Sequence, residues 1–179
     1  MPPPDPLTPA LSDPVRLAAV EALGLSDGPQ QELFARLNRI AVQLLGVPVS
    51  ILSLITDDRQ VHAAQVGLDA DEFTHSEFPL SHSFCKNVVA TGQALIVPDA
   101  REHPTVKDNG SVEDNGVIAY AGFPLRLASG EVVGAFCAID SEPHEWTPEQ
   151  LEIVKDLTAL ASELLDHRRA QNEQNEGAR

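Results

Sequence analysis

Two stretches of the chain space their apolar residues as helices do, and they enclose the segment between them. The first spans residues 29–45, and its apolar positions step by four, three and four: Leu33, Leu37, Ile40 and Leu44. The second spans residues 147–165 and repeats these steps: Ile153, Leu157, Leu160 and Leu164. This spacing puts an apolar stripe on one face of each helix. Both stripes are wide enough to pack on the body of a domain and leave part free for another helix.

The second of these helices has a well-defined start. Thr147 is a preferred N-cap residue, Pro148 suits the first helical position, and Gln150 completes a capping box. The first helix is followed by Gly46, which favours helix termination. The sequence therefore predicts two terminal helices, whose apolar faces either build the core alone or also join two copies of the chain.

Between the helices the pattern changes to short apolar runs rich in β-branched residues. These runs predict five strands, at residues 47–56, 60–65, 94–97, 119–127 and 131–139. Residues 81–91 interrupt the strands with helical spacing and are stopped by Gly92. Hairpin-connected strands flanked by helices are typical of an α+β domain with an antiparallel sheet.

The two ends of the chain lack the pattern of a packed core. Residues 1–14 contain six prolines, which predicts a flexible lead-in without regular hydrogen bonding. Residues 170–179 are almost entirely polar and are expected to fray. We therefore expect one ordered domain at residues 15–169. No stretch has the length and apolarity of a membrane span and no signal peptide is visible, which favours a cytoplasmic location.

The charge balance restricts the partners. Twenty-seven acidic and twelve basic residues give a net charge of −15, which opposes contact with phosphate backbones and anionic lipids. We therefore expect neither nucleic acid nor a membrane as a partner. Acidic residues gather in residues 57–78 and 99–115, where they are expected to be solvated loop charges that repel a strongly anionic ligand.

Several short motifs stand at defined points of this pattern. In chain order they are Phe84-Cys85, Pro98-Asp99-Ala100, Tyr120-Ala121-Gly122 with Pro124-Leu125 and Gly130, and the run 137–140. They fall on the expected middle helix, after the third strand and in the last hairpin. Together, in this order, they resemble the motifs of the GAF domain, a relative of the PAS domain in bacterial signalling proteins. The similarity extends over about residues 16–165.

The resemblance implies a central antiparallel sheet of five to six strands around a small-molecule pocket. The terminal helices would lie on one face of the sheet, and the middle helix and loops on the other. It also implies a sensor or protein-interaction module that forms a homodimer through its terminal helices, acts on a separate signalling protein and has no catalysis of its own. Where relatives often carry a Trp-Phe pair, this chain has Val61-His62, and only 4% of its residues are aromatic. Few faces are then available to stack a purine, which weakens a cyclic-nucleotide interpretation.

The resemblance places the pocket between the sheet and residues 81–89. Its candidate ligand-binding residues combine polar and apolar side chains, as small-molecule sites do: Ser81, His82, Ser83, Cys85, Tyr120 and Phe123. No cofactor is expected. Bilin-binding GAF domains attach the pigment through a cysteine followed by histidine, whereas Lys86 follows Cys85. The six histidines are not spaced as a metal-binding motif.

Two other functions stay open. One is a thiol or redox enzyme that resembles methionine sulfoxide reductases of the GAF fold and uses Cys85, since His82 would lie beside it on a helix. Against it, no cysteine between Cys85 and Cys137 can act as a resolving partner, and both cysteines are expected in the core. The other is a ligand-free dimerisation scaffold held by the helices that contain Leu37 and Leu157.

Overall fold

The computed structural model describes residues 5–24, 30–68 and 77–178. Within these residues one sheet holds six strands in the order β3-β2-β1-β6-β5-β4, and all neighbouring strands are antiparallel. The strands are β1 (Val49–Ile55), β2 (Arg59–Val66), β3 (Glu77–Pro79), β4 (Leu95–Val97), β5 (Ala119–Arg126) and β6 (Val132–Asp140). Sequence analysis missed β3, because its glutamate, phenylalanine and proline form no apolar run, whereas the equally short β4 is entirely apolar.

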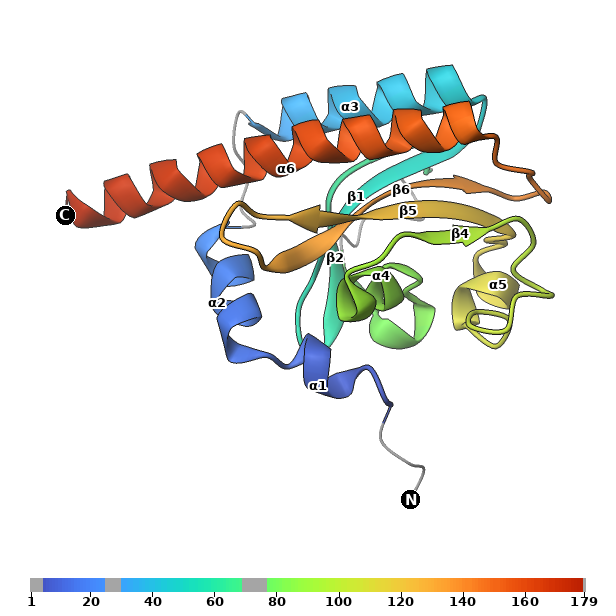
Figure 1. Cartoon of the computed structure of the whole chain (residues 1–179), viewed down its shortest axis with the longest axis horizontal. Coiled ribbons are helices and arrows are strands. Elements are labelled where there is room, and N and C mark those ends of the chain that lie inside the picture. The colour runs from blue at the N-terminus through green and yellow to red at the C-terminus, as the bar shows by residue number, and fades with distance from the viewer. Residues whose placement is uncertain (1–4, 25–29, 69–76, 179) are drawn as a thin grey trace.

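Helices cover both faces of the sheet. α3 (Gln30–Leu45) and α6 (Pro148–Gly177) lie side by side on one face (Figure 1). The 3-10 turn η1 (Leu80–His82), α4 (Cys85–Thr91) and α5 (Gly110–Asp114) lie on the other. This arrangement confirms the predicted α+β class, with the terminal helices on one face and the middle helix and loops on the other. The single turn of α5 was not predicted, because it is too short for apolar periodicity to register.

A hydrophobic layer lies on each face of the sheet, because successive side chains of a strand point to opposite sides. On β5, Ala121 and Leu125 join the layer beneath α3 and α6, whereas Tyr120 joins the layer beneath α4. On β6, Phe136 and Cys137 divide in the same way. Burial on both faces explains why the central strands are continuous apolar runs rather than alternating ones.

The apolar stripes of α3 and α6 are only partly buried. One edge faces the sheet: Phe34, Leu37, Ala41 and Leu45 on α3, and Val154, Leu157, Ala161 and Leu165 on α6. The other edge faces solvent, and we call it the outer stripe: Leu33, Ile40, Leu44 and Leu160, each more than two fifths exposed. The sequence pattern located both helices. Because both edges of each stripe are apolar, the pattern did not show which edge is buried and which is exposed.

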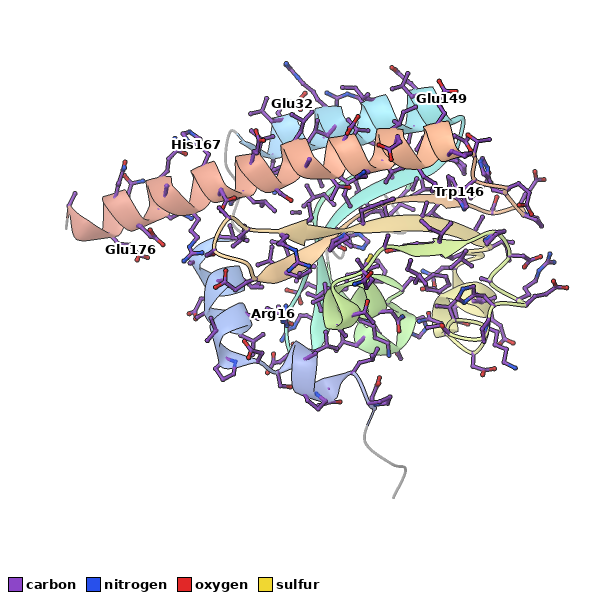
Figure 2. The ribbon with its side chains drawn as sticks, in the orientation of Figure 1. Arg16, Glu32, Trp146, Glu149, His167 and Glu176 are labelled. Carbon is purple, nitrogen blue, oxygen red and sulfur yellow. The ribbon has the colours of Figure 1, made fainter. Side chains whose placement is uncertain are left out.

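The start of α6 has the capping box that the sequence predicts. The backbone nitrogen of Gln150 donates to Thr147 Oγ1 at 3.2 Å, and that of Thr147 donates to Gln150 Oε1 at 3.0 Å. Just before this cap, Trp146 is buried, and its Nε1 donates to the Val97 carbonyl at 3.2 Å (Figure 2). The indole therefore anchors the segment between β6 and α6 to β4.

Residues 5–14, the described part of the segment expected to be a flexible lead-in at residues 1–14, are ordered. They contain α1 (Thr8–Leu11), whose residue Leu11 is buried in the layer beneath α4. Asp5 also forms an ion pair of 3.0 Å with Lys86 of α4. Prolines stand in the first turn of α1 and of the helix that follows, where a missing backbone donor costs no hydrogen bond.

Helix α6 continues past residue 169, where we expected the ordered domain to end. It meets the end of α2 (Pro14–Ala22), where Asn172 Nδ2 donates to the carbonyls of Ala22 at 3.1 Å and Leu23 at 3.0 Å. The last carbonyls of a helix have no hydrogen-bond donor within the helix, and the Asn172 side chain supplies a donor to the carbonyls at the end of α2. Polar composition alone did not indicate that contact.

Arg16 holds α2 to the end of β1. Its buried guanidinium donates to the carbonyls of Ile55 at 2.7 Å, Thr56 at 3.4 Å and Leu11 at 2.5 Å. Burial lowers the pKa of Arg16 below its ordinary value, although Asp13 opposes this effect. One side chain thus joins α1, α2 and the sheet.

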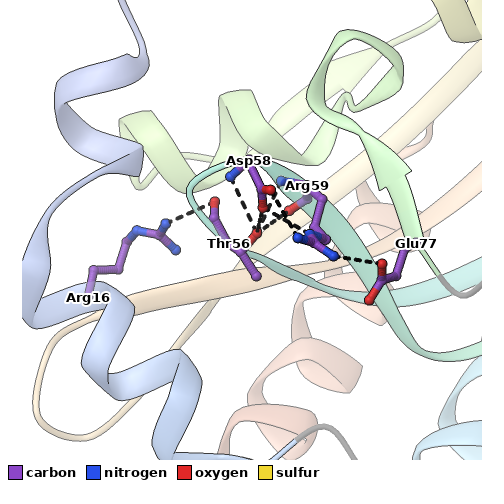
Figure 3. Close-up of polar contacts among 5 residues, drawn as sticks. All are labelled: Arg16, Thr56, Asp58, Arg59 and Glu77. Carbon is purple, nitrogen blue, oxygen red and sulfur yellow. Dashed lines mark hydrogen bonds and ion pairs between the residues drawn. The ribbon is translucent and has the colours of Figure 1, made fainter.

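The turn after β1 also secures the edge strand β3 (Figure 3). Arg59 Nε bonds Asp58 Oδ1 at 2.9 Å, and Arg59 Nη1 bonds Glu77 Oε2 at 2.9 Å. The backbone nitrogen of Arg59 donates to Thr56 Oγ1 at 3.1 Å, which closes the turn. Side-chain pairing therefore supplements the few ladder hydrogen bonds of a short strand.

Replacing Arg16 by alanine should lower the free energy of unfolding by about 2 kcal/mol, because buried carbonyl acceptors lose their donor. Arg101 provides the matched control, since its side chain is exposed and pairs only with Asp99 at the surface. Arg101→Ala should change the free energy of unfolding by less than about 0.5 kcal/mol. Urea unfolding followed by circular dichroism measures both, and equal effects would contradict the anchoring role of Arg16.

Candidate functional site

A cavity of about 210 Å³ lies between the sheet and the segments η1, α4 and α5. Its sheet wall comes from β1, β2, β3, β5 and β6. Much of the lining is apolar, as with Val49, Ile51, Phe78, Phe84 and Ile139. None of the described residues that line it is aspartate, glutamate, lysine or arginine. A molecule in this cavity would contact apolar surface and uncharged polar groups.

Three of the predicted ligand-binding residues, His82, Cys85 and Tyr120, line this cavity. Ser83 is fully buried behind the wall, where its hydroxyl donates to Gln60 Oε1 at 2.5 Å. Ser81 is exposed on η1 and does not belong to the lining. The structure therefore brings together the buried part of the predicted set.

Phe123 does not line this cavity, contrary to the expectation from sequence. It stands three residues from Tyr120 on β5, so the two side chains point to opposite faces of the sheet. Phe123 packs against the layer beneath α3 and α6. The sequence motif was near the site, but the pleat of the strand decides which of its residues reach the cavity.

Tyr120 lies along β5 over Gly122. A Cβ atom added to Gly122 would come within 2.2 Å of Tyr120 Oη, so the ring occupies the space that the glycine leaves. The ring is tilted against Phe84, with 5.3 Å between centroids, and Oη lies 3.2 Å from Cys85 Sγ. Burial raises the pKa of Tyr120 well above its ordinary value, so the phenol stays protonated. The Tyr120-Ala121-Gly122 motif thus places a neutral hydroxyl beside the cavity.

A chain of hydrogen bonds runs from α4 to β2 along the cavity wall. The backbone nitrogen of Lys86 donates to Ser83 Oγ at 3.0 Å, and Ser83 Oγ donates to Gln60 Oε1. Because Gln60 Oε1 accepts, its amide nitrogen is the donor to His62 Nε2 at 2.7 Å. His62 therefore carries its proton on Nδ1 and donates to Gln65 Oε1 at 2.6 Å. Each hydrogen bond in this chain then has a fixed direction.

His62 is a neutral imidazole in the folded protein, because burial lowers its pKa. Its ring stacks on Phe78 with 4.7 Å between centroids, and it lines the cavity together with Gln60. Sequence reasoning noted Val61-His62 only as a departure from relatives and did not place Gln60 or His62 in the site. The available signal was their spacing of two, which puts both on one face of a strand.

Helix α5 is held against η1 around His82. His82 Nε2 lies 2.8 Å from Asp114 Oδ2, and its Nδ1 lies 2.9 Å from Ser81 Oγ. Ser111 Oγ donates to the His82 carbonyl at 2.6 Å, and a Cβ atom on Gly110 would come within 2.5 Å of His82 Nε2. Hydroxyl, imidazole and carboxylate follow the order of a nucleophile triad, but Ser81 does not face the cavity and Asp114 is exposed. These contacts position a wall rather than activate a nucleophile.

Among the residues that the structure describes, no three histidine, cysteine, aspartate or glutamate side chains gather as metal ligands would. Nor does any helix in this part of the chain have the length and apolarity to cross a membrane.

The family comparison decides the classification. The family model for the GAF domain matches residues 29–165, which is most of the chain. The chain belongs to the GAF domain family. The match confirms the resemblance recognised from the motifs, and it begins after α1 and α2, so these two helices lie outside the matched residues.

One curated relative of this GAF domain is a cyclic di-GMP phosphodiesterase of Pseudomonas aeruginosa, 33% identical over 129 residues. The alignment covers 72% of this chain and 21% of that protein. The chain thus spans about a fifth of the length of this relative. The activity in the relative's name is a property of that longer protein.

Solved GAF structures share the fold at low sequence identity. The GAF domain of an Acinetobacter phosphoenolpyruvate-protein phosphotransferase has a TM-score of 0.67 at 15% identity, covering 90% of this chain and 99% of that chain. A free methionine-R-sulfoxide reductase from Neisseria meningitidis, in complex with its substrate, has a TM-score of 0.61 at 16% identity, covering 90% and 89%. The same fold thus occurs in a phosphotransferase domain and in a reductase, so the fold alone does not assign a function.

His62→Gln should make the free energy of unfolding less sensitive to acid. Unfolded His62 takes up a proton near pH 6.5, whereas folded His62 does so only at lower pH. The stability that depends on neutral His62 is present above this pH and is lost as the pH falls below it. As the pH falls below 6.5, wild type should lose stability more steeply than the variant in urea titrations, by up to about 1.4 kcal/mol per pH unit. Parallel pH profiles would contradict a buried neutral imidazole.

Proposed function

We propose that this chain is a small-molecule-sensing GAF module of bacterial signal transduction, whose ligand is uncharged and occupies the cavity beneath α4. The observation that carries the proposal is the lining: apolar side chains, a few hydrogen-bonding groups and no formal charge among the described residues. Small-molecule sites use this mixture. In this proposal the module works in the cytoplasm, acts on a separate signalling protein and performs no catalysis itself.

Size and charge restrict the ligand. The cavity of about 210 Å³ lies below the range of roughly 300–1,000 Å³ for drug-sized ligands, which favours a molecule smaller than a nucleotide. An anion would find no lysine or arginine among the described lining residues, and the net charge of −15 adds repulsion as it approaches. Gln60 keeps one amide proton after its bond to His62, so a neutral acceptor such as a carbonyl oxygen suits that end of the cavity.

Benzamide and benzoate test the charge argument, because they share a flat ring and nearly the same shape but only benzoate is charged. We expect benzamide to bind at least about tenfold more tightly than benzoate at pH 7.5, in titrations followed by ligand-observed NMR. The benzamide carbonyl should then accept from the Gln60 amide. Equal affinities, or tighter binding of benzoate, would contradict an uncharged ligand.

A pair of isoleucine variants tests the location. Ile139 is half-buried and lines the cavity, so Ile139→Trp should fill the space and abolish benzamide binding. Ile153 is half-buried on α6, on the opposite face of the sheet, so Ile153→Trp should leave binding unchanged. Circular dichroism verifies that both variants fold. Binding that survives in Ile139→Trp would place the site elsewhere.

We further propose that a second copy of the chain covers the outer stripe, so that the module forms a homodimer. The stripe runs over α3 and α6, which lie side by side, and exposed charges of opposite sign flank it. Arg36 and Arg39 lie on α3, whereas Asp156 and Glu163 lie on α6. A two-fold axis that places α3 of one copy over α6 of the other pairs these charges and buries the stripe.

Glutamates in the outer stripe should separate this dimer. Leu44 and Leu160 are 60% and 51% exposed, and we expect the double variant Leu44→Glu/Leu160→Glu to be monomeric in analytical ultracentrifugation. Val15→Glu is the matched control, because Val15 is an exposed apolar residue of α2, away from the stripe. A wild type that is already monomeric, or a control that dissociates equally, would contradict the proposed interface. A dimer that binds neither benzamide nor benzoate would favour the ligand-free dimerisation scaffold.

A further inference from the structure

The two cysteines of the chain lie on facing walls of one cavity. Cys85 is the first residue of α4, and Cys137 lies on β6 in the middle of the sheet. Both side chains line the cavity and belong to the same buried cluster. The 51 positions between them contain no other cysteine. The fold nevertheless brings the two thiols into hydrogen-bonding contact with each other at the cavity. The objection that Cys85 has no resolving partner therefore fails, because Cys137 itself is the neighbour.

The surroundings of the two thiols differ. Cys85 contacts the Cys137 thiol and the Tyr120 hydroxyl, and hydrogen bonding with these groups lowers the pKa of Cys85 despite burial. The same contact and burial raise the pKa of Cys137 well above its ordinary value. The Tyr120 hydroxyl, 3.2 Å from Cys85 Sγ, is well placed to stabilise a thiolate there. One sulfur is thus suited to attack an oxidant, while the other retains its proton until a second step.

We propose that Cys85 and Cys137 form a peroxide-reactive dithiol, which closes to a disulfide across the cavity between α4 and β6. The oxidant is a small hydroperoxide that enters the cavity. Among the described residues the lining is largely apolar and contains no aspartate, glutamate, lysine or arginine, so it admits such a neutral molecule, as it admits the proposed ligand. The disulfide itself does not require the proposed ligand to exist.

The reaction has two steps that balance. The Cys85 thiolate attacks the terminal oxygen of the hydroperoxide, the O–O bond breaks, and the remaining alkoxide takes a proton and leaves as an alcohol, or as water from hydrogen peroxide. Cys85 is then a sulfenic acid. The Cys137 sulfur attacks the Cys85 sulfur, the S–O bond breaks, and the hydroxide leaves as water with the Cys137 proton. One hydroperoxide is reduced by two electrons for each disulfide formed.

Formation of the disulfide between Cys85 and Cys137 would change the cavity. Cys85 begins the helix that forms one wall, and Cys137 lies in the opposite wall, so a covalent bond between them fixes the distance between the walls. It also removes the thiol that contacts Tyr120 Oη. This consequence for ligand binding rests on the proposed function, and we expect the oxidised protein to bind benzamide at least about tenfold more weakly.

The folded protein is treated with one equivalent of hydrogen peroxide, and the peroxide is then removed. The protein is denatured in the presence of N-ethylmaleimide, which labels free thiols, and its intact mass is measured. We expect a monomer that has lost two hydrogen atoms and takes up no maleimide, and that regains two reactive thiols with dithiothreitol. Two maleimide additions, an oxygen addition alone or a disulfide-linked pair of chains would each overturn the proposal.

Single variants separate the two steps. In Cys137→Ser the sulfenic acid on Cys85 should persist and be trapped by dimedone, whereas Cys85→Ser should leave Cys137 unmodified. The reaction rate of wild type should rise in proportion to the peroxide concentration. A rate that levels off at the rate of unfolding would mean that the thiols react only in the open chain, which contradicts the proposal.

These outcomes are distinct from those of the ligand proposal. A disulfide that forms in a protein unable to bind benzamide supports the dithiol and contradicts the ligand. Benzamide binding without disulfide formation does the reverse.

Discussion

The pleat of a sheet that is buried on both faces determines where each functional side chain lies. On β5 and β6 neighbouring residues belong to different layers, so one residue supports α6 while the next reaches the cavity beneath α4. Gly122 leaves the space into which the Tyr120 ring extends, and this brings the hydroxyl to Cys85. The cavity, its neutral polar groups and the meeting of the two cysteines all depend on this alternation.

The N-terminal helices connect the two faces of the sheet. α1 packs against α4 on the cavity side, and α2 contacts α6 on the other side. Arg16 fixes the junction between them to the end of β1, and Asn172 joins the end of α2 to α6. These helices precede the residues that the GAF family model matches, so the connection lies outside the matched part of the chain.

Much of the fold could be predicted from sequence because long periodic segments carry strong signals. The capping box at Thr147 located α6, and the apolar runs located five strands. The short elements β3 and α5 could not be found this way, since their existence depends on tertiary contacts such as Arg59 with Glu77. At the site, the motifs located the cavity region but did not show which residues of each strand face it. The predicted ligand-binding residues therefore include Phe123 and omit Gln60.

The central claim is that the cavity beneath α4 holds a small uncharged molecule. Native mass spectrometry of the protein purified from its natural source, compared with the denatured mass of the same sample, tests it most directly. The account predicts a noncovalent small molecule that is released on denaturation and carries no formal charge. A released nucleotide or other anion, or a protein whose native mass is that of the bare chains alone, would contradict the claim.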